Sequence, residues 1–140
     1  MGIKEYLNQA HRLDQRINSK LDQIASLHDL ATKATVTYSD MPRNPNKGKS
    51  KLEDTIVKIM ELEEEINRDI DRLVELKGDI THLIKKLDNH EYQILLEQRY
   101  LCFKSWEQIS VDMGYSIQHT YRLHDEALTE LNKIFKDESK

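Results

Sequence analysis

Three side chains near the C-terminal end of the chain could read the bases of a nucleic acid. Gln118, Tyr121 and Arg122 project from the early turns of one predicted helix, away from its apolar stripe. A glutamine amide offers a donor and an acceptor to an adenine edge, and a guanidinium pairs with guanine or with a phosphate. A tyrosine donates its hydroxyl to a phosphate or presses its ring on a thymine methyl group. These residue types predict contacts with double-stranded DNA.

The residues around this set predict a helix-turn-helix. A helix over 90–101 is followed by a short helix capped by Ser105, with Gln108 as its capping-box partner. Gly114 supplies the left-handed residue that ends the short helix, and Ser116 caps the last helix. In helix-turn-helix proteins the first turns of that last helix enter the major groove. The predicted DNA-binding residues are Arg99 and Lys104 as phosphate anchors, with Ser116, Ile117, Gln118, His119, Tyr121 and Arg122.

The same helices have an apolar side that predicts a small core. On the short helix, Trp106 and its neighbours at three- and four-residue steps are expected to pack inward. On the last helix the inward positions are Thr120, Leu123, Ala127, Leu128, Leu131 and Ile134. His124 lies next to this stripe, and we expect it to make a structural hydrogen bond.

Two long helices precede the motif. Apolar residues recur at steps of three and four over 3–34, and at strict intervals of seven over 51–88. The second helix is expected to be capped by Ser50, with Glu53 as its capping-box partner. Its nearest partner is the first helix, folded back as an antiparallel hairpin. Its apolar positions exceed what a two-helix seam needs, so we expect a homo-oligomer, with a dimer favoured. The predicted oligomerisation residues are Leu52, Ile59, Ile66, Leu73, Ile80 and Leu87.

A segment over 35–50 separates the two long helices. Pro42 and Pro45 disfavour helix at the residues before them, and the asparagines and Gly48 favour turns. This composition predicts a solvated loop. The segment is also locally basic, and the alternative is a mobile arm that touches phosphates.

The composition predicts an all-α protein with two domains. Charged residues make up 33% of the chain and hydrophobic residues 38%, with four Gly and two Pro. We expect a helical hairpin and oligomerisation domain over 1–88 and a helix-turn-helix domain over 89–140. No stretch is apolar enough to cross a membrane, and the single cysteine, Cys102, cannot form an internal disulfide. These features favour the cytoplasm.

The charge of the chain argues against strong DNA binding by one copy. The formal net charge is −4, and residues 89–140 carry six Lys and Arg against nine Asp and Glu. Few basic groups release few counterions from DNA, so a lone domain should bind weakly. Two such domains on a dimer would raise the effective concentration and compensate.

The run from Leu95 to Leu131 resembles the promoter-reading domain, region 4, of sigma-70-like factors. The matching motifs are Glu107-Gln108-Ile109-Ser110, Gly114-Tyr115-Ser116 and Ala127-Leu128-x-x-Leu131. The whole chain is similar to small phage and prophage proteins related to the ArpU and RinA type of late-gene transcription regulators. That similarity includes the N-terminal KEYL, Met41-Pro42 and Tyr121-Arg122-Leu123-His124. It implies DNA binding and transcriptional control of phage genes in the cytoplasm of a bacterial host cell, without the segments that a full sigma factor uses to melt promoters. Thr120 departs from the larger aliphatic residue usual in sigma factors.

Two other classes of function compete with this interpretation. In one, the protein is an interaction module that docks on RNA polymerase or acts like a small phage packaging subunit, without sequence-specific readout of DNA. The other class is an enzyme, which we do not expect. His119 and His124 are five residues apart, which does not suit a helical metal pair, and Cys102 is more typical of a small buried residue than of a nucleophile. We expect no catalytic residues, no metal and no cofactor.

Overall fold

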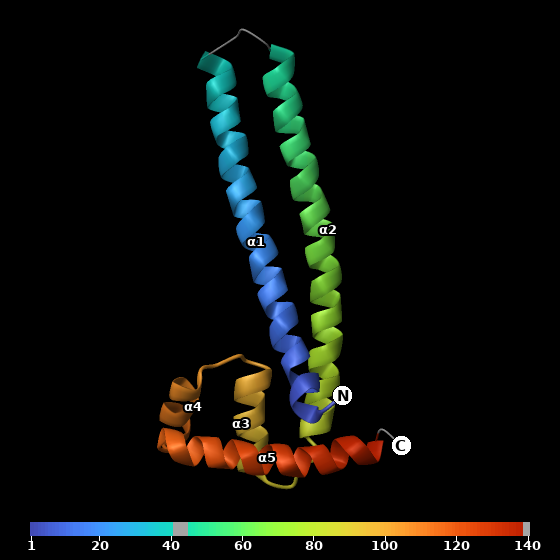
Figure 1. Ribbon diagram of the computed structural model, residues 1–140, viewed down its shortest axis with the longest axis vertical. Coiled ribbons are helices and arrows are strands. Elements are labelled where there is room, and N and C mark those ends of the chain that lie inside the picture. The colour runs from blue at the N-terminus through green and yellow to red at the C-terminus, as the bar shows by residue number, and fades with distance from the viewer. Residues whose placement is uncertain (41–44, 139–140) are drawn as a thin grey trace. The chain divides into compact units, whose positions relative to one another are not determined.

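The computed structural model describes residues 1–40 and 45–138, and these residues form helices joined by short connections (Figure 1). The helices are α1 (Ile3–Asp40), α2 (Pro45–Ile84), α3 (His90–Tyr100), α4 (Trp106–Met113) and α5 (Ile117–Glu138). The long helices α1 and α2 run side by side in opposite directions (Figure 1). The predicted all-α fold, with a long antiparallel hairpin followed by smaller packed helices, is therefore confirmed.

The chain divides into two compact units. One comprises Met1–Leu13 and Leu73–Lys140, and the other comprises Asp14–Arg72. The first turns of α1 and the last turns of α2 thus belong to the same unit as the three short helices. The predicted domain boundary between residues 88 and 89 does not coincide with this division, and it stays a prediction.

The unit Asp14–Arg72 is a two-helix stem. Ile17 of α1 and Ile59 and Ile66 of α2 are its buried aliphatic side chains. Lys20 Nζ lies 2.7 Å from Asp69 Oδ2, and the two side chains are only 15% and 13% exposed. The hydrogen bond from Lys20 holds the pKa of the Asp69 carboxyl below its usual value. Glu65 Oε2 lies 3.6 Å from the same nitrogen, so Lys20 lies between two carboxylates beside the aliphatic side chains of the stem.

The segment between the long helices is shorter than the sequence predicts. The loop expected over 35–50 is wrong in extent, because α1 continues to Asp40 and α2 already begins at Pro45. Proline suits the first residue of a helix, where its fixed φ is favourable and its missing N–H costs nothing. Ser50 consequently lies inside α2 and cannot cap it with Glu53, so that prediction is also wrong. The predicted basic arm falls largely on residues 41–49, whose side chains lie outside the described part.

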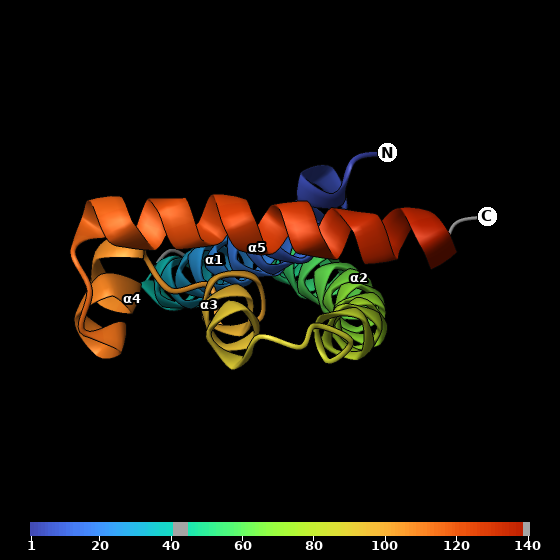
Figure 2. The same ribbon diagram turned by 90° about the horizontal axis from the view of Figure 1, so that it is seen from below.

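The other unit has its core where the three short helices pack on one another. Each of α3, α4 and α5 contacts the other two, and Figure 2 shows α5 lying across α3 and α4. In the same unit, Leu7 of α1 and Ile80 and Ile84 of α2 are also fully buried. The buried side chains of the short helices are Leu95, Leu96, Tyr100, Ile109, Ser110, Thr120, Leu123, His124, Ala127 and Leu131.

The predicted heptad residues are mostly covered by their own chain, but the last of them, Leu87, lies beyond α2, which ends at Ile84 and not near residue 88 as predicted. Of the six predicted oligomerisation residues, Ile59, Ile66, Leu73, Ile80 and Leu87 are buried in the single chain, and Leu52 is half-buried. Their role in contacts between copies stays a prediction. A different set of apolar side chains in the stem is exposed, and it comprises Leu21, Leu30, Ile56, Val57, Met60 and Ile70.

Candidate nucleic-acid interface

Local hydrogen bonds define the two helices of the candidate interface. The Ser105 hydroxyl accepts from the Gln108 N–H at 3.2 Å at the start of α4. Gly114 has a left-handed backbone (φ 75°), and the Tyr115 N–H donates to the Ser110 carbonyl at 3.0 Å, which closes α4 with a Schellman motif. The predicted caps and turn residue are confirmed here, and so is Ser116, whose hydroxyl accepts from the His119 N–H at 3.2 Å.

Two buried hydroxyl groups join α4 to α5. Ser110 Oγ lies 2.9 Å from Thr120 Oγ1, and the Thr120 hydroxyl also lies 2.9 Å from the Ser116 carbonyl oxygen. Thr120 is fully buried. A hydrogen-bonded pair of hydroxyls thus lies at the contact of the two helices, and both polar groups keep partners in the core.

The first turns of α5 present the predicted reading residues at the surface. Gln118, Tyr121 and Arg122 are exposed, and Ile117 and His119 are half-buried. Within the described ranges, the Gln118 amide and the Arg122 guanidinium have no hydrogen bond or ion pair. Gln118 and Arg122 are therefore accessible and free to bind, whereas the exposed Tyr121 ring already contacts Trp106.

His119 is oriented by the turn rather than free to rotate. Its ring packs on Tyr115 in a T-shaped arrangement with the centroids 4.4 Å apart. The Tyr115 hydroxyl in turn donates to the Glu91 carboxylate of α3. The hydrogen bond between Tyr115 and Glu91 joins the turn to α3. The ring contact with Tyr115 leaves His119 less available for DNA than Gln118.

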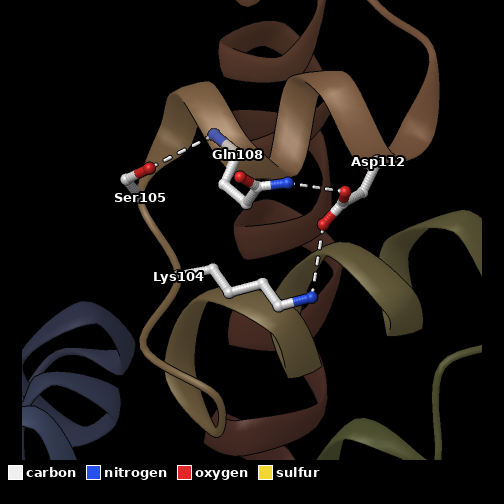
Figure 3. Close-up of polar contacts among 4 residues, drawn as sticks. All are labelled: Lys104, Ser105, Gln108 and Asp112. Carbon is white, nitrogen blue, oxygen red and sulfur yellow. Dashed lines mark hydrogen bonds and ion pairs between the residues drawn. The ribbon is translucent and has the colours of Figure 1, made fainter.

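Lys104 already has a carboxylate partner. Its Nζ lies 3.2 Å from Asp112 Oδ2, and Gln108 Nε2 donates to the other oxygen of Asp112 at 2.7 Å (Figure 3). These two hydrogen bonds hold the pKa of Asp112 below its usual value. The predicted capping box also needs the Gln108 side chain to bond back to the backbone at Ser105. This part of the prediction is wrong, because the Gln108 side chain bonds to Asp112 instead (Figure 3). Lys104 would therefore have to leave Asp112 to anchor a phosphate with its full charge.

Arg99 is the other predicted phosphate anchor, and it has no carboxylate partner among the described residues. Its Nη1 donates to the Lys104 carbonyl at 2.9 Å. Its guanidinium carbon lies 4.7 Å from the ring centroid of Trp106, which is a cation–π distance. Arg99 is half-buried at the junction of α3 and α4, and its partners there, a carbonyl and a ring, do not neutralise its charge.

A buried pair of ring side chains lies beneath this junction. The Tyr100 hydroxyl is 2.7 Å from His124 Nε2, which confirms the structural hydrogen bond predicted for His124. Burial raises the pKa of Tyr100 to about 12 and lowers that of His124 to about 4. The phenol therefore keeps its proton, and the imidazole is neutral at pH 7.

The connection between α3 and α4 contains features that the sequence did not indicate. Phe103 has a left-handed backbone (φ 58°), which is unusual for a residue with a side chain. Its ring lies 4.7 Å from Lys77 Nζ and makes a T-shaped contact with His11. These partners are remote in the sequence, so no local signal could identify them. Cys102 is exposed, contrary to the expectation of a buried residue, because it lies in this irregular connection.

The remaining surroundings of α5 are acidic. Asp125 and Glu126 are exposed one turn beyond Arg122, and Glu126 accepts a hydrogen bond from the Tyr92 hydroxyl at 3.1 Å. Among the residues whose side chains are described, 1–33 and 50–138, no cluster of His, Cys, Asp or Glu could hold a metal ion. Over the same residues, none of the helices is apolar enough over a sufficient length to traverse a bilayer.

Comparison with known proteins places the chain in a family. The model of a family of proteins of unknown function, DUF1492, matches residues 41–132, so the chain belongs to the DUF1492 family. The matched residues include α3, α4 and most of α5, with the residues of the candidate interface. No curated protein and no solved structure matches the chain.

Proposed function

We propose that this DUF1492 protein is a phage-type transcriptional regulator that binds double-stranded DNA and reads a promoter or operator with the first turns of α5. The observation that carries the proposal is the pair Gln118 and Arg122. Both side chains are exposed and uncommitted on the helix that follows the turn at Gly114. A helix in this position presents its first turns to the major groove in helix-turn-helix proteins.

The distribution of cations suggests how such a protein would hold DNA. Arg122 would contact a base edge or a nearby phosphate, and Arg99 would contact the phosphate backbone. Because Lys104 is paired with Asp112, one copy offers few free cations. A homo-oligomer with two reading helices would bind two half-sites and gain affinity from the high effective concentration of the second helix.

Selection from DNA of random sequence tests this function. The full-length protein is incubated with duplexes that contain a randomised central segment, and the bound duplexes are recovered and sequenced. We expect enrichment of one sequence with two related half-sites. Recovery of duplexes with no shared sequence would contradict sequence-specific regulation.

Arg122→Ala provides the matching test of the site. The variant should lower affinity for the selected duplex by about tenfold or more, since one good base or phosphate contact is lost. The control is Lys136→Ala, which removes the same charge from the exposed far end of α5. Normal binding by Arg122→Ala would remove the proposed contact.

A protein-interaction module is the second candidate, and two observations favour it. The charge of residues 89–140 is acidic, and Val111 on α4 is 75% exposed. An exposed aliphatic residue on an acidic helical unit suits a protein partner such as RNA polymerase or a large packaging subunit. Co-purification with one of these partners that is lost in Val111→Asp, together with failure to enrich any DNA, would favour this candidate.

A further inference from the structure

Trp106 is the single tryptophan of the chain, and it lies at the centre of three ring and cation contacts. The Arg99 guanidinium lies over the indole at 4.7 Å, and the Tyr121 ring meets it in a T-shaped contact at 5.5 Å. The ring of His124 approaches it at 4.5 Å. Trp106 is only half-buried, so this cluster reaches the protein surface. The indole thus joins Arg99, a predicted phosphate anchor, to Tyr121, a predicted reading residue.

We propose that Trp106 is a positioning residue of the DNA interface, which holds the Arg99 guanidinium in the orientation that receives a phosphate of duplex DNA and sets the place of the Tyr121 ring. This inference rests on the proposed function and names how one cation of the interface is prepared. Trp106 itself need not touch DNA. It acts through the two side chains that it contacts.

Two contacts fix the orientation of Arg99 before any ligand arrives. The indole face supports the guanidinium plane, and the Lys104 carbonyl accepts one of its N–H groups at 2.9 Å. A guanidinium has five N–H donors, so most of them remain for another acceptor. An arginine that is ordered in the free protein loses less side-chain entropy when it binds a phosphate. In the described residues no carboxylate neutralises Arg99, whereas Lys104 is paired with Asp112.

The side chains around the indole keep this arrangement electrostatically favourable. A charged imidazole beside Trp106 would repel Arg99, but burial and the neighbouring Lys4 and Arg99 lower the pKa of His124 to about 4, although Asp125 opposes them. His124 is also anchored by the Tyr100 hydroxyl at 2.7 Å. The indole therefore has a neutral, fixed neighbour in the core and a cation at the surface.

The test compares Trp106→Leu, Trp106→Phe, Arg99→Ala and the double variant Trp106→Leu with Arg99→Ala. The probe is the duplex recovered from the random pool, and affinity is measured by fluorescence anisotropy over a series of salt concentrations. Trp106→Leu should weaken binding by about tenfold and reduce the slope of log affinity against log salt by about 0.9, the value for one phosphate contact. Arg99→Ala should give the same two changes, and the double variant should lose no more. Trp106→Phe should retain most of the affinity because it keeps an aromatic face.

A second measurement does not depend on DNA. The Nε–H resonance of Arg99 in a ¹H–¹⁵N spectrum of the free protein should be shifted upfield by the indole ring, and the shift should disappear in Trp106→Leu. Circular dichroism and thermal unfolding establish that each variant is folded.

Different failures identify different errors. If the parent protein binds no duplex, the proposed function is overturned, and the positioning role with it. If the parent binds but Trp106→Leu keeps the parental affinity and salt slope, only the inference fails. Additive losses in the double variant, or an unshifted Arg99 resonance, would equally overturn it. A Trp106→Leu variant that does not fold leaves the Arg99 resonance of the parent as the deciding measurement.

Discussion

At the scale of single residues, the cations of the candidate interface differ in how far their charge is already used within the chain. Arg122 has no partner in the described residues, Arg99 has a carbonyl and an aromatic ring, and Lys104 has a carboxylate. A carboxylate neutralises a cation, whereas a carbonyl or a ring only orients it. We therefore expect the three residues to contribute to DNA affinity in that order.

Removing the carboxylate partner of Lys104 should increase DNA affinity. Asp112→Asn keeps the shape of the side chain and an acceptor for Gln108, but it releases the Lys104 charge. We expect tighter binding of the selected duplex by about fivefold and a salt slope steeper by about 0.9, as one more phosphate contact becomes available. Glu107→Gln is the control, because it removes the same charge from the same helix without freeing a lysine. An equal gain in DNA affinity in both variants would mean that the loss of any negative charge near the DNA is sufficient. A gain in Asp112→Asn that persists when Lys104 is also replaced by Met would mean the same.

The buried His124 predicts a pH dependence of stability. Its pKa is about 4 in the folded protein against 6.5 in a solvated chain, so the unfolded state binds more protons between these values. The free energy of unfolding should therefore fall as the pH decreases from about 6.5 to about 4, by on the order of 2 kcal/mol. Urea denaturation at a series of pH values measures this loss. It should vanish in His124→Gln and persist in His28→Gln, which changes an exposed histidine. Asp69 contributes only at lower pH, because its pKa lies below 3.8.

At the scale of helices and turns, sequence signals predict the structure correctly where they act on neighbouring residues. Ser105, Gly114 and Ser116 act on backbone groups within a few residues, and their predicted roles are confirmed. The start of α2 differs from the prediction because proline disfavours helix at the residue before it but is itself suited to the first position of a helix, where Pro45 lies. Phe103 was missed because its conformation is supported by partners that are distant in the sequence.

In the candidate site too, features set by neighbouring residues can be predicted from the sequence, and contacts between elements cannot. Which side chains of α5 are exposed could be predicted, because one periodicity separates Gln118 and Arg122 from Leu123 and Ala127. The pairing of Lys104 with Asp112 could not, because it joins an irregular connection to the last turn of α4. Nor did the sequence place Arg99 on the face of Trp106. Periodicity predicts the exposed face of a helix, whereas contacts made by connections depend on the packed structure.

Two glycines provide a matched test of the turn between α4 and α5. Gly114 has a left-handed backbone, so Gly114→Ala should lower the free energy of unfolding by about 1–2 kcal/mol even though there is room for the methyl group. Gly78 lies within α2 with open space around it, so Gly78→Ala should raise the free energy of unfolding by about 1 kcal/mol. Urea denaturation of the two variants should show shifts of opposite sign. A neutral Gly114→Ala would mean that the turn does not require this conformation.

At the scale of the whole molecule, two sets of apolar side chains in the stem bear on the predicted homo-oligomer. The predicted seam is largely occupied within one chain, since Ile59 and Ile66 are buried. Ile56, Met60 and Ile70 of the stem are exposed, although each is a large apolar side chain. An oligomer would therefore use this exposed set more readily than the heptad residues.

Sedimentation of two stem variants distinguishes these surfaces. Met60→Glu should keep its helix content and sediment as a smaller species than the parent, because it adds a charge to the exposed set. Ile66→Asp should instead lose helix content, because it places an unpaired charge in a buried position at a cost of several kcal/mol. If the parent sediments as a monomer at every concentration, the predicted homo-oligomer is wrong. If Met60→Glu sediments like the parent, another surface joins the copies.

The ion pair between Lys20 and Asp69 constrains how the stem could change in length during evolution. A deletion of two residues in one helix alone would rotate Lys20 or Asp69 out of the seam by about 200° and separate the two charges. A loss of one heptad from each helix, on the loop side of the pair, would preserve both the facing and the alignment of the charges. Homologous stems should therefore shorten or lengthen in matched heptads, with the ion pair as the fixed reference point.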